Sequence, residues 1–163
     1  MIYLDSAATT LQKPPEVARA SAWAICHLAS PGRGGHRPAM AAADTAFACR
    51  EEAAALFDVP EPEQVVFTFN ATHGLNLLLK GLLRPGDRVV TSPMEHNAVL
   101  RPLRQLERAG VEVEYLPCTE RGELVTENLA ERLTPGVRAV VLTHASNVSG
   151  TRFPIGAVGA LCR

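Results

Sequence analysis

The sequence predicts an α/β protein with a mainly parallel sheet and crossover helices, preceded by an N-terminal helical segment. After about residue 60, short β-branched runs alternate with amphipathic stretches at the spacing of strand–helix–strand units. Before that point the chain is rich in alanine and punctuated by proline and glycine. We therefore divide it into residues 1–60, an extended segment with helices, and residues 61–163, part of an α/β domain.

Two helices are predicted before residue 60. The first begins at Pro14 or Pro15, because proline suits a first helical turn, where its missing N–H is not needed, and it runs to about Ser30. The second runs from Pro38 to Phe57, where alanine favours helix.

In the second region strands and helices alternate. Strands are predicted at residues 64–69, 88–91, 111–116 and 137–142, and helices at residues 75–83, 97–109, 126–133 and 155–163. The strand at residues 137–142 is apolar enough to be central. Parallel strands joined by crossovers place ligands at their carboxyl ends. The last helix has no capping glycine or polar tail after it, so we expect a fragment of a longer chain.

Charge and composition exclude several kinds of partner. Sixteen basic and seventeen acidic side chains leave a formal charge of -1 without a block of one sign, which argues against nucleic acid and anionic membranes. No apolar run could span a bilayer, and the first residues do not form a signal peptide, so we expect a cytoplasmic protein. The four cysteines form no C-x-x-C pair, so neither a disulfide framework nor a metal site is expected.

Polar residues follow three of the predicted strands. Ala71 and Thr72 stand where a strand passes into a helix, and free N–H groups there, with the Thr72 hydroxyl, can hold an anion. The alternative is that Thr72 is only a helix N-cap. His96 can stack on a flat ring and exchange protons, or it is a solvated residue of a capping cluster. The amide of Asn147 can donate to a phenolate-like oxygen, and Gly150 allows a close backbone approach.

Four segments in this order resemble class V, fold-type I pyridoxal-phosphate enzymes, and most of all the cysteine desulfurase and selenocysteine lyase branch. They are residues 3–10 (YLDSAATT), 69–76 (FNATHGLN), 94–99 (MEHNAV) and 146–151 (SNVSGT). The resemblance covers the whole chain. It implies that residues 61–163 are the incomplete N-terminal part of a large domain of the pyridoxal-phosphate-dependent transferase type.

The resemblance assigns roles to individual residues around the cofactor pyridoxal 5'-phosphate. In the family, residues matching Ala71 and Thr72 hold the phosphate, the histidine matching His96 stacks on the pyridine ring as a candidate acid/base, and the amide matching Asn147 bonds near the 3-oxygen. The substrate-side lining would comprise Ala7, Ala8, Arg33 and His36, although Arg33 and His36 also suit an ordinary exposed loop. Many relatives have glutamate where this chain has His73.

The implied activity is removal of sulfur from L-cysteine to give alanine. The family's Schiff-base lysine, pyridinium aspartate and reactive cysteine match positions beyond residue 163, so the 163-residue chain is expected to be inactive by itself. A homodimer and a sulfur-acceptor protein are the implied partners of the complete enzyme. Two alternatives stay open: another class V enzyme (aminotransferase, epimerase or kynureninase-like hydrolase), or a non-catalytic phosphate-binding module, which lacks support from a G-x-G-x-x-G or Walker lysine pattern.

Overall fold

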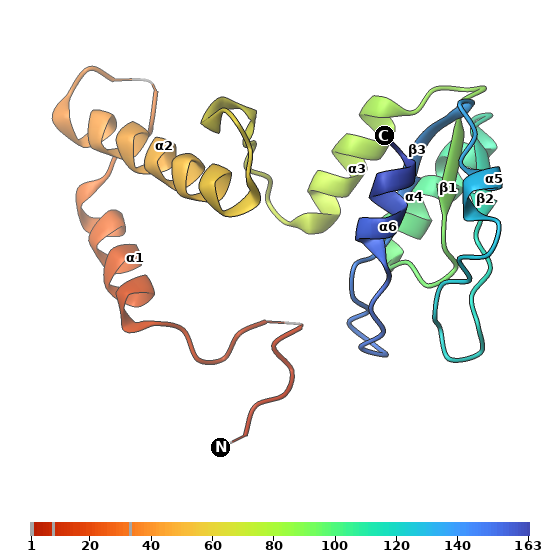
Figure 1. Cartoon of the computed structure of the whole chain (residues 1–163). Coiled ribbons are helices and arrows are strands. Elements are labelled where there is room, and N and C mark those ends of the chain that lie inside the picture. The colour runs from red at the N-terminus through yellow and green to blue at the C-terminus, as the bar shows by residue number, and fades with distance from the viewer. Residues whose placement is uncertain (1, 8, 33) are drawn as a thin grey trace. The chain divides into compact units, whose positions relative to one another are not determined.

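The computed structural model describes residues 2–7, 9–32 and 34–163, which divide into two compact units (Figure 1). The first unit is Met1–Phe67 and the second is Thr68–Arg163. Two of the expected substrate-side residues, Ala8 and Arg33, lie outside the described residues. None of the described helices combines the length and the apolar character that crossing a membrane requires.

The first unit contains helices α1 (Pro15–His27) and α2 (Arg37–Phe57) and the short 3₁₀ helix η1 (Pro62–Gln64). Both predicted α-helices are present, and both carry a proline in the first turn. Helix α1 ends earlier than predicted because Leu28 is extended. Helix α2 ends where Asp58 takes the left-handed conformation, with φ of 54°.

The strand predicted at residues 64–69 is wrong. This segment continues from η1 into irregular backbone, and its large side chains are exposed, with 73% of Val66 and 93% of Phe69 accessible. No described strand pairs with it. A β-branched run becomes a strand only where a neighbouring strand supplies hydrogen bonds, and none of the described strands does so for this segment.

The second unit is built on a parallel sheet of β1 (Arg88–Thr91), β2 (Glu112–Tyr115) and β3 (Val137–Val141), in the order β2-β1-β3. Its helices are α3 (Ala71–Leu82), α4 (Asn97–Arg108), α5 (Leu129–Arg132) and α6 (Ile155–Leu161) (Figure 1). The predicted α/β class with parallel strands and crossover helices is confirmed. The predicted central position of the last strand is wrong, because β1 lies between its two partners and β3 is at an edge of the described sheet.

Apolar side chains cover both faces of this sheet. Val89 and Val90 of β1 are fully buried and lie in different clusters, as expected for consecutive strand residues. The first cluster is supplied by β1, α3, α4 and the residues just after α3 and just before β2: Leu79, Leu83, Val89, Val99, Leu103 and Val111. The second extends to α5 and α6: Val90, Leu116, Leu124, Leu129, Phe153 and Val158.

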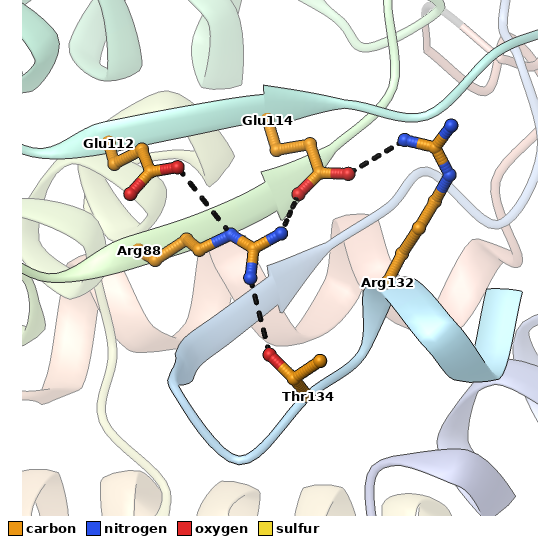
Figure 2. Close-up of polar contacts among 5 residues, drawn as sticks. All are labelled: Arg88, Glu112, Glu114, Arg132 and Thr134. Atoms are coloured by element: carbon orange, nitrogen blue, oxygen red, sulfur yellow. Dashed lines mark hydrogen bonds and ion pairs between the residues drawn. The ribbon is translucent and has the colours of Figure 1, made fainter.

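A network of ion pairs and hydrogen bonds joins β1, β2, α5 and the loop between α5 and β3 (Figure 2). Arg88 donates to Glu114 and, over 3.2 Å, to the hydroxyl of Thr134, while Arg132 donates to Glu114 over 2.8 Å. Nε of Arg88 lies 3.7 Å from Glu112 as an ion pair. Burial opposes the charge of Glu114, but the hydrogen bonds and charges of the two arginines together lower its pKa.

Candidate functional site

A cavity of about 280 Å³ is lined by the loop after β1 and the loop after β3. Since both loops follow the carboxyl ends of parallel strands, the cavity lies where ligands bind in open α/β sheets. Its lining residues are Pro93, Met94, Glu95, His96, Asn97, Ser146, Asn147 and Val148. The structure therefore brings together two predicted site residues, His96 and Asn147, that are far apart in the sequence.

His96 is the N-cap of α4, and its ring also faces solvent. Its Nδ1 accepts a 3.1 Å hydrogen bond from the backbone N–H of Ala98. In the neutral ring the hydrogen then resides on Nε2, which is free to donate. His96 therefore does cap the helix, as the alternative supposed, but only through Nδ1. Its Nε2 and the face of its ring stay available to a ligand.

Asn147 lies in a short loop that closes on itself. Ala145 and Arg152 form an antiparallel bridge, and the hydroxyl of Ser146 accepts hydrogen bonds from two backbone N–H groups of the loop. Gly150 has φ of +72°, a conformation that favours glycine. The exposed Asn147 amide makes no hydrogen bond within the described part of the chain, so its donors and its acceptor are available.

Sequence reasoning missed Glu95, which is only 7% exposed and also lines the cavity. Its Oε1 accepts hydrogen bonds from the hydroxyl of Ser92, over 2.7 Å, and from the backbone N–H of Thr143, over 2.8 Å. Burial raises the pKa of Glu95, and these two hydrogen bonds oppose the shift only partly. A carboxylate directly before His96 was a visible signal, but its burial depends on β3, which is distant in sequence.

The N-terminus of α3 presents unpaired donors. Asn70 is its N-cap and accepts a 2.8 Å hydrogen bond from the N–H of His73, so the alternative that Thr72 is the cap is wrong. Within the described residues, the backbone N–H groups of Ala71 and Thr72 and the Thr72 hydroxyl donate to no protein acceptor. These donors at the positive end of a helix suit an anion. Ala71 and Thr72 do not line the cavity that contains His96.

The side chain of His73 packs against Phe69, just before α3. Its ring is stacked on Phe69 with 5.2 Å between the centroids, and its Nδ1 accepts a long, 3.4 Å hydrogen bond from the Phe69 N–H. The histidine therefore supports the turn before α3.

The remaining predicted residues, Ala7 and His36, belong to the first unit. Ala7 lies in an exposed turn. His36 is exposed directly before α2, and its carbonyl accepts hydrogen bonds from Ala39 and Met40. Their substrate-side role stays a prediction.

Two separate sets of donors suit different parts of pyridoxal 5'-phosphate. No group of three or more His, Cys, Asp or Glu side chains suited to a metal occurs in the described ranges. In contrast, two N–H groups and a hydroxyl at a helix N-terminus match a phosphate, and an imidazole and an amide beside a cavity match a flat ring with a polar oxygen.

The chain matches the sequence profile of the aminotransferase class-V family over residues 2–163. The chain belongs to this family. It is 36% identical to a probable cysteine desulfurase of Vibrio cholerae serotype O1, across 97% of this chain and 40% of the relative. It is 34% identical to the cysteine desulfurase IscS of Shewanella loihica, across 99% of this chain and 41% of the relative.

Two solved structures are similar to this chain in fold. The apo cysteine desulfurase of Thermococcus onnurineus NA1 superposes with a TM-score of 0.87 at 28% identity, covering 99% of this chain and 41% of that one. A protein described as SspA in complex with cysteine gives a TM-score of 0.83 at 28% identity, covering 98% and 46%. The resemblance to the N-terminal portion of class V cysteine desulfurases is thereby confirmed, and the chain spans about two fifths of the length of these curated relatives.

Proposed function

We propose that this chain is the N-terminal part of a pyridoxal-phosphate-dependent cysteine desulfurase-like enzyme that removes sulfur from L-cysteine and leaves alanine. The observation that carries the proposal is the cavity at the strand ends, which brings His96 beside Asn147. The cysteine desulfurases that resemble the chain over nearly all of its length support the reaction.

Four residues would hold the cofactor. The N–H groups of Ala71 and Thr72, with the Thr72 hydroxyl, would hold the phosphate, while the His96 ring would stack on the pyridine and the Asn147 amide would donate to the ring oxygen. When bound, the cofactor withdraws electrons from the α-carbon of the substrate.

The geometry of His96 limits how it moves a proton. While Nδ1 accepts the Ala98 hydrogen bond, the ring acts as a hydrogen-bond donor through Nε2. A second proton on the ring must occupy Nδ1, so His96 takes it up only by giving up the cap of α4. Acid–base work at His96 therefore includes a small rotation of the ring away from Ala98.

Residues 1–163 by themselves do not complete turnover under this proposal. The two lysines present are Lys13, whose Nζ donates to the Thr10 carbonyl, and Lys80, exposed on the last turn of α3. Neither matches the family's imine-forming lysine. Alone with the cofactor, this part of the chain should release no sulfide above the rate of free pyridoxal phosphate.

A homodimer, a protein that accepts the sulfur and a cytoplasmic location complete the proposal. All four cysteines are unpaired, which suits a reducing compartment.

The test is to supply the full-length protein with pyridoxal 5'-phosphate, L-cysteine and a reductant. Sulfide and alanine should appear in equal amounts, at a rate well above that of the free cofactor. Parallel assays offer the protein an amino donor with a 2-oxo acid, a single enantiomer of an amino acid, or kynurenine. Turnover of one of these without sulfide from L-cysteine would instead identify another class V activity. Phosphate-dependent binding without any turnover would identify a binding module.

A further inference from the structure

Glu95 joins the two sides of the cavity through one oxygen atom. It stands in the loop between β1 and α4, next to His96, and it is nine-tenths buried. Its Oε1 accepts from Ser92 within the same loop and from Thr143, two residues beyond the end of β3. The loop that carries His96 is thus tied to the segment that leads to Asn147.

A second hydrogen bond joins the last residue of β1 to the last residue of β3, just before these two loops begin. The hydroxyl of Thr91, which is completely buried, donates a 2.9 Å hydrogen bond to the carbonyl of Val141. Strand pairing ends at the register of these two residues. Beyond it, the Glu95–Thr143 hydrogen bond continues the connection where the backbone ladder has stopped.

We propose that Glu95 is a positioning residue, which keeps the loop of His96 and the loop of Asn147 at the separation that a ring between them requires. It acts through these two neighbours and does not itself touch the reacting atoms. The effect on the bound cofactor rests on the proposed function, whereas the effect on the two loops does not.

The bonding pattern shows that the carboxyl acts as an acceptor at Oε1. Both of its hydrogen bonds are received there, and no protein donor among residues 2–7, 9–32 and 34–163 reaches Oε2. Oε2 therefore has no protein partner in that part of the chain, and burial raises the pKa of Glu95 despite the two hydrogen bonds at Oε1. Glutamine keeps a carbonyl oxygen that can accept both hydrogen bonds, and it replaces the second carboxyl oxygen with a neutral NH₂ group.

The experiment compares Glu95→Gln, Glu95→Leu and Ser92→Ala in the full-length protein, with Glu107→Gln on the exposed side of α4 as the matched control. Amide hydrogen exchange is followed in peptides covering residues 93–99 and 143–151. Glu95→Leu should speed exchange in both by about tenfold or more, as expected when buried hydrogen bonds are lost. Glu95→Gln and the control should stay within about twofold of wild type, and Ser92→Ala should fall between them.

Cofactor affinity gives a second readout, which needs no turnover. The concentration of pyridoxal 5'-phosphate that half-saturates the protein should rise about tenfold for Glu95→Leu and be restored by glutamine. Unchanged exchange at residues 143–151 in Glu95→Leu, or exchange in Glu95→Gln as fast as in Ser92→Ala, overturns the proposal. If Glu95→Leu does not fold, the other two variants still decide. If the wild-type protein neither binds the cofactor nor releases sulfide, but the four variants show the expected exchange pattern, the proposed function is refuted. The positioning role of Glu95 in the two loops then still holds.

Discussion

Arg132, the last residue of α5, donates a 2.8 Å hydrogen bond to Oε1 of Glu114 on β2 (Figure 2). The other oxygen of Glu114 is paired with Arg88 of β1, so one carboxylate joins two strands and a helix. Such a pair is not strong evidence of net stabilisation, because desolvation offsets much of the attraction. Removing one partner is nonetheless costly, since it leaves the other charges unpaired.

Glu114→Leu should lower the free energy of unfolding by about 1–3 kcal/mol, since Arg88, with 27% of its side chain exposed, loses its main partner. Glu112→Leu is the matched control, because that side chain is 72% exposed and its ion pair is long. It should change stability by less than about 0.5 kcal/mol. Urea unfolding of the full-length protein measures both, and equal losses in the two variants would contradict the assignment.

The pH dependence of stability should differ in sign for two glutamates. The pKa of Glu114 is lowered on folding, so its contribution is present above the ordinary glutamate value of about 4.3 and is lost as pH falls through the folded value. Glu114→Gln should therefore destabilise at neutral pH and do so progressively less in acid.

The pKa of Glu95 is raised, so its contribution is complete below that ordinary value and is lost as pH rises through the folded value. Glu95→Gln should consequently gain stability relative to wild type as pH rises. Thermal unfolding from about pH 2 to pH 8 covers the range on both sides of the ordinary glutamate value for the two glutamine variants, and parallel curves for them would contradict the opposite shifts.

Thr72→Val should weaken retention of pyridoxal 5'-phosphate by about tenfold without changing stability, because the Thr72 hydroxyl donates to no acceptor among residues 2–7, 9–32 and 34–163. Asn70→Ala removes the true cap of α3 and should cost about 1 kcal/mol of stability. Equilibrium dialysis with the cofactor and thermal unfolding separate the two effects. Unchanged retention in Thr72→Val would remove that hydroxyl from the phosphate site.

His96→Asn separates the two uses of this residue. Asparagine caps helices well, so α4 should keep its stability while the ring is lost, and turnover should fall by about 10²–10⁴-fold. His96→Ala should lose the same activity and also about 1 kcal/mol of stability, because the Ala98 N–H loses its acceptor. Sulfide release and unfolding are measured on both variants. Full turnover in His96→Asn would show that the ring takes no part.

Local chemistry was sufficient to predict much of the fold. Prolines marked where α1 and α2 begin, and alternating apolar patterns located β1 and α4 closely. His96 and Asn147 could be proposed together because each follows a strand, and parallel strands end at one edge of a sheet. These features depend on neighbours in sequence and on a general rule of topology.

Only the tertiary structure decided the rest. The run at residues 64–69 has strand composition but no partner in the described sheet, so its apolar side chains stay exposed. Asn70, not Thr72, caps α3, because the position at which the helix begins decides which side chain can reach a free N–H. Glu95 is buried only because β3 returns beside β1 and brings Thr143 to its carboxyl, a contact that arises from pairing between distant segments.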